Sequence, residues 1–213
     1  MIRNVLVGLA ACVSMMCSPA DAQGRAPGDV LLTELKKGGL VIYLRHMPAD
    51  VGVDQYEVTD WWRECKLQRG LNDRGRVAAR ELGFVLRGLA VPVGEIWSGE
   101  LCRIKETALL LGFSQVQVDV RPELNDFMTL NAQGKPHAEI VPGYQRAVGI
   151  PPPPGTNRIV VSHSQRGRFS AHPSLDLLAM GGASVFRPGA DGSFQLLGML
   201  RLEDWRLLGV SEP

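Results

Sequence analysis

The sequence predicts an α/β fold, a three-layer α/β/α sandwich with a mostly parallel central sheet and a C-terminal hairpin. Short apolar runs typical of buried strands alternate along the chain with segments of helical periodicity, which is the pattern of a parallel sheet covered by helices. Near the C-terminus, the turn-forming segment 188–192 separates two apolar segments, which indicates a hairpin.

The first half of the chain alternates helix and strand. A short helix is expected over 31–37, where two glycines follow, and the apolar run 40–44 is typical of a buried strand. The clearest helix spans 73–89, because apolar residues recur there at helical spacing and Asn72 is a suitable N-cap. A second strand is expected at 93–97.

The second half continues this alternation. A helix over 101–111 precedes the segment 116–120, where valines alternate as they do in a strand. The proline run 151–154 is interpreted as a loop before the buried strand 158–162. The hairpin strands and a last helix are then expected at 183–186, 194–200 and 202–208.

The composition is that of one globular domain. The chain has 213 residues, of which 45% are hydrophobic and 21% charged, so we expect a sizeable core and no extensive disorder. A net charge of +1 argues against a nucleic-acid-binding protein, since such proteins usually carry a strong basic surplus. Residues 23–213 are expected to form a single domain.

Residues 1–22 are typical of a signal peptide. Arg3 provides the positive n-region, 5–17 is a short apolar stretch, and Ala20-Asp21-Ala22 fits the small-residue cleavage pattern. A membrane-spanning helix needs about 20 residues, so cleavage after Ala22 is favoured over a membrane anchor and over lipidation at Cys17. The protein is then expected in the periplasm or secreted, without stable membrane insertion after cleavage.

Two cysteines, Cys65 and Cys102, remain after this cleavage. A single pair in an oxidising compartment predicts a disulfide, and two buried free thiols are the alternative. The bond would close a long loop and stabilise the fold by roughly 3–4 kcal/mol.

Two histidines, His46 and His163, each come just after a predicted buried strand. Ligands of open α/β sheets bind at the carboxyl ends of the strands, so these side chains are expected to meet although they are far apart in the sequence. The segment 98–103 also follows a strand and starts a helix. Its backbone N–H groups and Arg103 would suit an anion.

Four motifs follow one another along the chain: Leu44-Arg45-His46, 71–76, Trp97 to Ala108 and 160–163. Together they resemble the histidine phosphatase superfamily, also called phosphoglycerate-mutase-like. Leu44-Arg45-His46 resembles the family signature, and 71–76 resembles the start of its next helix. Trp97 to Ala108 resembles the segment that carries the family's second arginine, and 160–163 resembles its late strand and second histidine. The matches keep the family's order from about residue 39 to residue 165.

The resemblance implies a reaction through a phosphohistidine at His46. Arg45 and Arg103 would hold the phosphoryl oxygens by charge-assisted hydrogen bonds, and His163 would stabilise the charge that develops on them. Neutral His46 would attack phosphorus, which is covalent catalysis. No metal or other cofactor is expected, because the two guanidiniums can neutralise the phosphoryl charge.

The proton donor is less narrowly defined. Asp126 lies in a segment that resembles the family's acid-donor segment, and Glu123 is the nearby rival; a capping role for Asp126 is the alternative. Arg69 is a candidate substrate-binding residue, and Arg63 and Gln68 share its loop. For these loop residues, surface solvation is an equal alternative.

Other chemistry-bearing residues are interpreted as structural. His137 and His172 have no partner that the sequence identifies and are expected at the surface. Trp61-Trp62 is interpreted as buried packing in preference to a stacking platform for substrate.

Three departures from the family pattern affect the phosphate site. Met47-Pro48 stands where a small residue is usual, and proline lacks a backbone donor. Ser164 replaces glycine and is expected to crowd a turn. Glu100 places an acid near the expected anion site.

The leading functional prediction is an exported phosphatase of small-molecule or glycolipid phosphate esters. The tail around 185–188 is similar to exported bacterial members, which implies envelope sugar phosphates, such as the heptose phosphate of the lipopolysaccharide core, as substrates. A non-catalytic phosphate- or glycan-binding module on the same fold is the alternative. A mutase is a third possibility that export disfavours.

Overall fold

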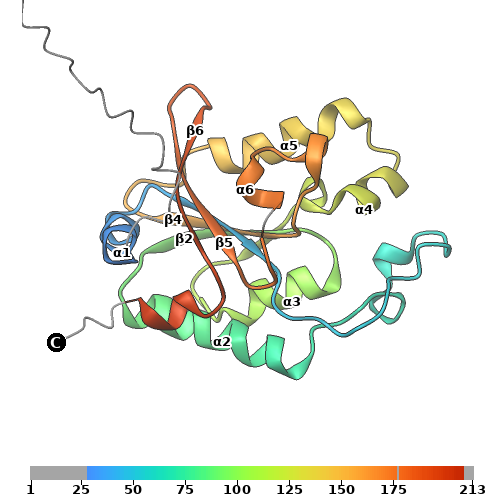
Figure 1. Cartoon of the computed structure of the whole chain (residues 1–213), viewed down its shortest axis with the longest axis horizontal. Helices are drawn as coiled ribbons and strands as arrows, with labels where there is room; N and C mark the ends of the chain where they lie inside the picture. Colours follow the sequence, from blue (N-terminus) through green and yellow to red (C-terminus); the bar gives the residue numbers. More distant parts are fainter. Residues whose placement is uncertain (1–27, 177, 209–213) are drawn as a thin grey trace, which may run out of the picture.

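A six-stranded sheet forms the centre of the computed structural model, which describes residues 28–176 and 178–208 (Figure 1). The strand order is β3-β2-β4-β1-β5-β6. The first four strands in this order pair in parallel, and β5 and β6 are antiparallel to their neighbours. The mostly parallel sheet and the C-terminal hairpin are therefore confirmed. The strands are β1 (Val41–Arg45), β2 (Val93–Ser98), β3 (Val118–Val120), β4 (Asn157–Ser162), β5 (Ala183–Pro188) and β6 (Phe194–Leu200).

Helices cover both faces of this sheet and complete the three predicted layers (Figure 1). Leucines of α1, α2 and α3 pack into one core, whereas residues of α5 and α6 pack into a second core on the opposite face. The helices are α1 (Gly28–Lys37), α2 (Asp73–Gly88), α3 (Cys102–Leu110), α4 (Phe127–Ala132), α5 (His137–Gly149) and α6 (Pro173–Asp176). The predicted signal peptide, 1–22, lies outside the described residues. None of the helices within the described residues is both long and apolar enough to span a bilayer.

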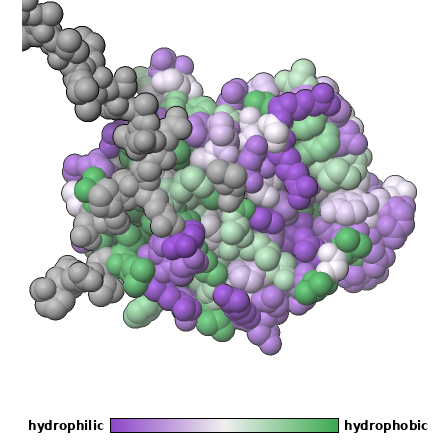
Figure 2. Space-filling model, in the orientation of Figure 1, coloured by the Kyte–Doolittle hydropathy of each residue, from purple (hydrophilic) through white to green (hydrophobic). Residues whose placement is uncertain are grey.

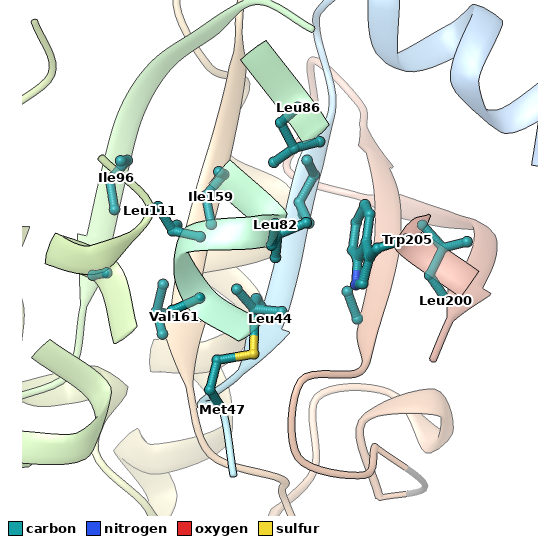
Figure 3. Close-up of a cluster of buried hydrophobic side chains, with 14 of the residues drawn as sticks. Leu44, Met47, Leu82, Leu86, Ile96, Leu111, Ile159, Val161, Leu200 and Trp205 are labelled. Carbon is teal, nitrogen blue, oxygen red and sulfur yellow. The ribbon is translucent and has the colours of Figure 1, made fainter. Parts of the chain in front are cut away.

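Alternation along the central strands divides the two cores. In β1, Ile42 and Leu44 belong to the core under α2, and Tyr43 belongs to the opposite one, as the period of two in a strand requires. Figure 3 shows Leu82 of α2 in the same cluster as Leu44 and Ile159. Both faces of β1 and β4 are thus buried, which explains the apolar runs 41–44 and 159–161 within them.

The hydrophobic pattern misses the helices between β3 and β4. Neither α4 nor α5 was expected, and α5 contains Pro142 and Gly143, which are residues that usually interrupt a helix. The expected strand over 116–120 is also shorter, because pairing with β2 starts only at Val118. In place of the expected last helix, 202–208, the chain forms a 3-10 turn over Asp204–Leu207.

α2 packs closely on the loop that follows β1. Its N-cap is Asn72, as predicted, and the Asn72 side chain accepts a 2.8 Å hydrogen bond from the N–H of Gly75. A Cβ atom on Gly75 would lie 2.0 Å from the carbonyl oxygen of Pro48. The helix can therefore approach the residues after His46 this closely only because Gly75 has no side chain.

The strand order brings three loops to one edge of the sheet. β4 inserts between β1 and β2, so the order of the strands reverses there, and such a switch point is where ligands bind in open α/β sheets. Arg45 at the end of β1 is paired with Ser162 at the end of β4. The segments that follow these strands therefore lie side by side at the carboxyl end of the sheet. They carry His46, His163 and the start of α3.

Candidate active site

His46 and His163 face each other at this edge. Their ring centroids lie 4.8 Å apart, with the ring planes tilted by 53°. The N–H of His46 donates a 3.0 Å hydrogen bond to the carbonyl oxygen of Ser162, which continues the pairing of β1 and β4 by one residue. The structure thus brings together the two histidines that the sequence places after separate strands.

The protonation state of His46 follows from its neighbours. Its Nδ1 atom lies 2.8 Å from the carbonyl oxygen of Met47, and a carbonyl only accepts, so Nδ1 carries the hydrogen. In the neutral ring, Nε2 then holds a lone pair; this atom is buried without a hydrogen-bond partner among the described residues. Burial lowers the pKa of His46 well below its usual value, and the nearby His163 and Arg103 lower it further. His46 is therefore a neutral imidazole whose Nε2 is available as a nucleophile.

His163 is also neutral. Burial lowers its pKa to about 3, and the charges of Arg103 and Arg45 contribute to the shift. Its Nδ1 lies 3.4 Å from the carbonyl oxygen and 3.5 Å from the hydroxyl oxygen of Ser164, so neither contact is short enough to define the tautomer. The hydroxyl of Tyr43 donates a 2.9 Å hydrogen bond to the carbonyl oxygen of His163 and holds the loop in place.

Arg103 is the most deeply buried cation of the site. It lies in the first turn of α3, directly after β2, and only 1% of its side chain is exposed. Its Nη1 and Nη2 atoms donate to the two carboxylate oxygens of Asp54 at 3.1 and 3.0 Å. Its Nε is buried and has no partner in the described part of the chain.

Three further arginines, Arg45, Arg69 and Arg166, lie in the same region as Arg103. Arg45 donates from Nη1 to the carbonyl oxygen of Leu178 at 2.8 Å. Burial lowers the pKa of Arg45 first, and the positive charges of Arg103, Arg166 and Arg69 lower it further. Four guanidiniums therefore lie in one region together with the carboxylates of Asp54 and Asp126.

Asp126 combines the two roles considered for it. Its Oδ1 accepts a 2.8 Å hydrogen bond from the N–H of Thr129 and caps α4. Its Oδ2 lies 3.9 Å from Nη2 of Arg103, so the carboxylate also borders the arginine cluster.

Glu123 lies outside this cluster. It is only partly exposed, lies 3.8 Å from Arg121, and lines a separate surface hollow with Leu130, Lys135 and Glu139. The proton-donor candidate that the geometry favours is consequently Asp126.

The loop between β1 and α2 is fastened onto the first turn of α3. The predicted disulfide is present between Cys65 and Cys102, with a Cα–Cα distance of 5.6 Å. Beside it, the N–H of Cys102 donates a 2.8 Å hydrogen bond to Oε1 of Gln68. Arg69 lies close enough for its charge to lower the pKa of His163. Arg63, in contrast, is exposed and lies 3.8 Å from Asp60.

The departures from the family pattern are accommodated. Met47 points into the hydrophobic core (Figure 3), and the carbonyl oxygen of Pro48 accepts from the N–H of Asn72. Ser164 is not among the described residues with positive φ, so its backbone conformation does not require glycine. The carboxylate of Glu100 accepts hydrogen bonds from the neutral amides of Asn125 and Gln133.

Sequence reasoning missed part of the site. Asp54 and Arg166 lie in irregular loops, where no periodicity distinguishes them from solvated residues, and Tyr43 reads only as a core residue. The expectation for His172 is wrong, because its ring is partly buried, hydrogen-bonds to Ser174 at 2.9 Å and packs on Phe186. Trp61 is buried, as predicted.

Neutral imidazoles lie among clustered guanidiniums at the carboxyl edge of a parallel sheet. Such an arrangement is suited to binding an anion and to nucleophilic chemistry. The family model "Histidine phosphatase superfamily (branch 1)" matches residues 58–150. The matched segment includes Arg103 and Asp126, and the structure adds His46 and His163 from either side of it. A search of curated protein sequences finds no match.

Solved structures of phosphatases share the fold. The protein histidine phosphatase SixA, complexed with tungstate, superposes with a TM-score of 0.51 at 15% identity, over 78% of this chain and 98% of that one. A protein provisionally assigned as an alpha-ribazole-5'-P phosphatase, from Escherichia coli, gives a TM-score of 0.50 at 16% identity, over 78% and 98% of the two chains. These structures share the fold of this chain, and its residues 58–150 are similar to the histidine phosphatase superfamily (branch 1).

Proposed function

We propose that the protein is an exported phosphatase that hydrolyses phosphate monoesters through a phosphohistidine on Nε2 of His46. One observation carries the proposal: the hydrogen bond from Nδ1 to the carbonyl oxygen of Met47 leaves the lone pair on Nε2. This buried nitrogen faces His163 and lies near Arg103 and Arg45. A nucleophile and the cations that an anionic substrate needs are therefore in one place.

The reaction has two steps. First, Nε2 of His46 attacks phosphorus, the N–P bond forms, and the ester P–O bond breaks while the leaving alkoxide takes a proton from the carboxylic acid of Asp126. Second, the Asp126 carboxylate takes a proton from water, the water oxygen attacks phosphorus, and the N–P bond breaks to release inorganic phosphate. The position of Asp126 beside Arg103 supports this dual role.

Arg45, Arg103 and His163 stabilise the phosphoryl group in both steps. The guanidiniums donate charge-assisted hydrogen bonds to its oxygens. When Nδ1 of His163 accepts a hydrogen bond from the Ser164 hydroxyl, 3.5 Å away, Nε2 carries the hydrogen and donates to a third oxygen. Because the donors are buried, they interact with the developing charge in a region of low dielectric constant.

Export and an envelope sugar phosphate as substrate complete the proposal. Residues 1–22 fit a cleaved signal, and the Cys65–Cys102 disulfide suits an oxidising compartment. Phosphorylated sugars and glycolipid phosphates of the envelope are the phosphate monoesters available there. Cell fractionation and the mass of the mature protein test the first part, with cleavage after Ala22 as the expected result.

The experiment that tests the activity uses p-nitrophenyl phosphate and an alkyl phosphate with wild type, His46→Ala and the matched control His137→Ala. We expect turnover by wild type and the control, none by His46→Ala, and an acid-labile, alkali-stable phosphoryl group on quenched wild type. Phosphate binding without turnover would favour the binding module. Transfer to a second hydroxyl in preference to water would favour a mutase.

A further inference from the structure

Asp54 is buried although the valines next to it in its loop are exposed. Its relative exposure is 1%, whereas that of Val51 is 102% and that of Val53 is 80%. Figure 1 shows that this loop, which joins β1 to α2, projects from one side of the molecule. Figure 2 shows apolar surface among polar residues there. Burying a carboxylate while leaving valines in water reverses the usual preference. The conformation of the loop therefore buries the Asp54 carboxylate in preference to the neighbouring valines.

Both oxygens of the Asp54 carboxylate are fully engaged. Oδ1 accepts from Nη1 of Arg103 at 3.1 Å and from the N–H of Arg69 at 2.7 Å. Oδ2 accepts from Nη2 of Arg103 at 3.0 Å and from the hydroxyl of Tyr56 at 3.4 Å. A carboxylate held by four donors has little freedom to turn toward a substrate.

The contact uses one edge of the Arg103 guanidinium and leaves another free. A guanidinium has five N–H groups in a rigid plane, and Asp54 takes one from each Nη atom. The Nε–H and the second hydrogen of Nη2 form a separate fork on the side edge of that plane. Nε is buried and unpartnered among residues 28–176 and 178–208, and Asp126 lies beside Nη2. A phosphate on this fork would receive two parallel hydrogen bonds.

The loop that carries Asp54 is tied to the same helical turn as Arg103. The Cys65–Cys102 disulfide and the bond from the N–H of Cys102 to Gln68 both end one residue before Arg103. The N–H of Gln55 also donates to the carbonyl oxygen of Leu67 at 2.9 Å. Asp54 is thereby fixed relative to the start of α3.

From this geometry we infer that Asp54 is a positioning residue: it grips the Nη edge of Arg103 so that the Nε–Nη2 edge presents a fixed fork to the phosphoryl group, and it does not itself transfer protons. The inference rests on the proposed function, since it assigns the phosphoryl group to that edge. A buried ion pair alone adds little stability relative to well-packed apolar residues. The buried carboxylate in this loop therefore fits a role in orienting Arg103.

Phosphate binding tests the inference without turnover. Isothermal titration calorimetry with inorganic phosphate is applied to wild type, Asp54→Asn, Asp54→Glu and the control Asp50→Asn, which alters an exposed carboxylate of the same loop. We expect Asp54→Asn to bind about 10- to 100-fold more weakly, the range for losing hydrogen bonds to a charged group. Asp54→Glu, which restores the charge, should recover part of the affinity, and the control should match wild type. Wild-type affinity in Asp54→Asn would overturn the inference.

Leaving-group dependence separates positioning from proton transfer. We expect Asp54→Asn to lower kcat/KM by the same factor for p-nitrophenyl phosphate and for an alkyl phosphate. Asp126→Asn should instead affect mainly the alkyl ester, whose alkoxide needs a proton. A selective loss of the alkyl reaction in Asp54→Asn would identify Asp54 as the donor and refute the inference.

A measurement on wild type keeps the test independent of how the variants fold. In nitrogen-detected NMR, with the Arg103 resonance assigned through Arg103→Lys, phosphate should shift the Nε–H signal of Arg103. An unchanged Nε–H signal at saturating phosphate would contradict the inference. If wild type binds phosphate on this edge but no ester is hydrolysed, the proposed function fails while the role of Asp54 stands.

Discussion

The hydroxyl of Tyr43 donates a 2.9 Å hydrogen bond to the carbonyl oxygen of His163. This bond joins the middle of β1 to the first residue after β4, and Nε2 of Gln165 donates to the same hydroxyl at 3.0 Å. Burial raises the pKa of Tyr43 to about 12, so the hydroxyl keeps its hydrogen. Both histidines of the site are thus positioned by β1: His46 follows its last residue, and His163 is hydrogen-bonded to Tyr43 in its middle.

Removing this hydroxyl should loosen His163. We expect Tyr43→Phe to lose about 1–3 kcal/mol of unfolding free energy, because a buried carbonyl and a buried amide lose a partner. It should also lower kcat by severalfold while the nucleophile stays intact. Urea unfolding and steady-state kinetics measure the two effects. Unchanged kcat would show that His163 is positioned without this bond.

The neutral histidines should make stability depend on pH. The folded-state pKa of His163 is about 3, whereas an unfolded chain has a histidine pKa near its ordinary value of about 6.5. Below that value the unfolded state binds the proton and the folded state does not, so stability is complete above about pH 6.5 and falls as the pH falls. From pH 7 to pH 5 the loss for this histidine is about 2 kcal/mol.

Urea unfolding of wild type and His163→Gln at pH 7 and pH 5 checks this prediction. The variant should lose about 2 kcal/mol less than wild type over this interval. The pKa of His46 is lowered as well, so His46→Gln should also flatten the pH dependence. Equal losses in wild type and both variants would mean that the imidazoles are not held neutral.

Gly75 should tolerate no side chain. A Cβ atom there would lie 2.0 Å from the carbonyl oxygen of Pro48, so the usual gain of about 1 kcal/mol for Gly→Ala in a helix should be reversed. We expect Gly75→Ala to be destabilised and to lose activity, because α2 must move away from the residues after His46. Gly88→Ala is the matched control in the same helix, since a Cβ atom on Gly88 would meet nothing within 4 Å.

Thermal unfolding of the two variants compares them directly. Gly75→Ala should have a lower Tm than wild type, and Gly88→Ala should not. A Tm for Gly75→Ala equal to or above that of wild type would show that the helix shifts at no cost.

The disulfide should stabilise the fold. Its cysteines are 37 residues apart, and a loop of that size corresponds to about 4 kcal/mol on the chain-entropy estimate. We expect Cys65→Ser/Cys102→Ser to lose stability of that order and to bind phosphate more weakly, because the loop that carries Asp54 is then held by fewer contacts. Denaturant unfolding and calorimetry measure both, and wild type treated with reductant should reproduce the variant.

The hydrophobic pattern alone predicted those helices and strands whose apolar residues are clearly buried. The apolar runs before His46 and His163 are buried on both faces, and their position in the sheet follows from parallel pairing. α5 was missed because Pro142 and Gly143 interrupt its sequence pattern, although packing of Tyr144 and Val148 maintains the helix. The cysteine pairing followed from parity and compartment.

The part of the site that sequence reasoning missed depends on loop conformation. Asp54 stands between exposed valines, and only the three-dimensional path of the loop shows that its carboxylate is buried against Arg103. Nothing in the spacing relates the two residues. The family resemblance pointed to Arg45, His46, Arg103 and His163, whereas the groups that hold those residues in place required the structure.

The central position of β1 has a consequence for biosynthesis. Both of its neighbours in the sheet, β4 and β5, are translated long after it, so a nascent chain carries this apolar strand without a partner until residues 157–188 have been made. The two histidines of the site therefore cannot come together before His163 has emerged. They meet only in the nearly finished polypeptide, and until then the apolar strand needs another partner to shield it from water.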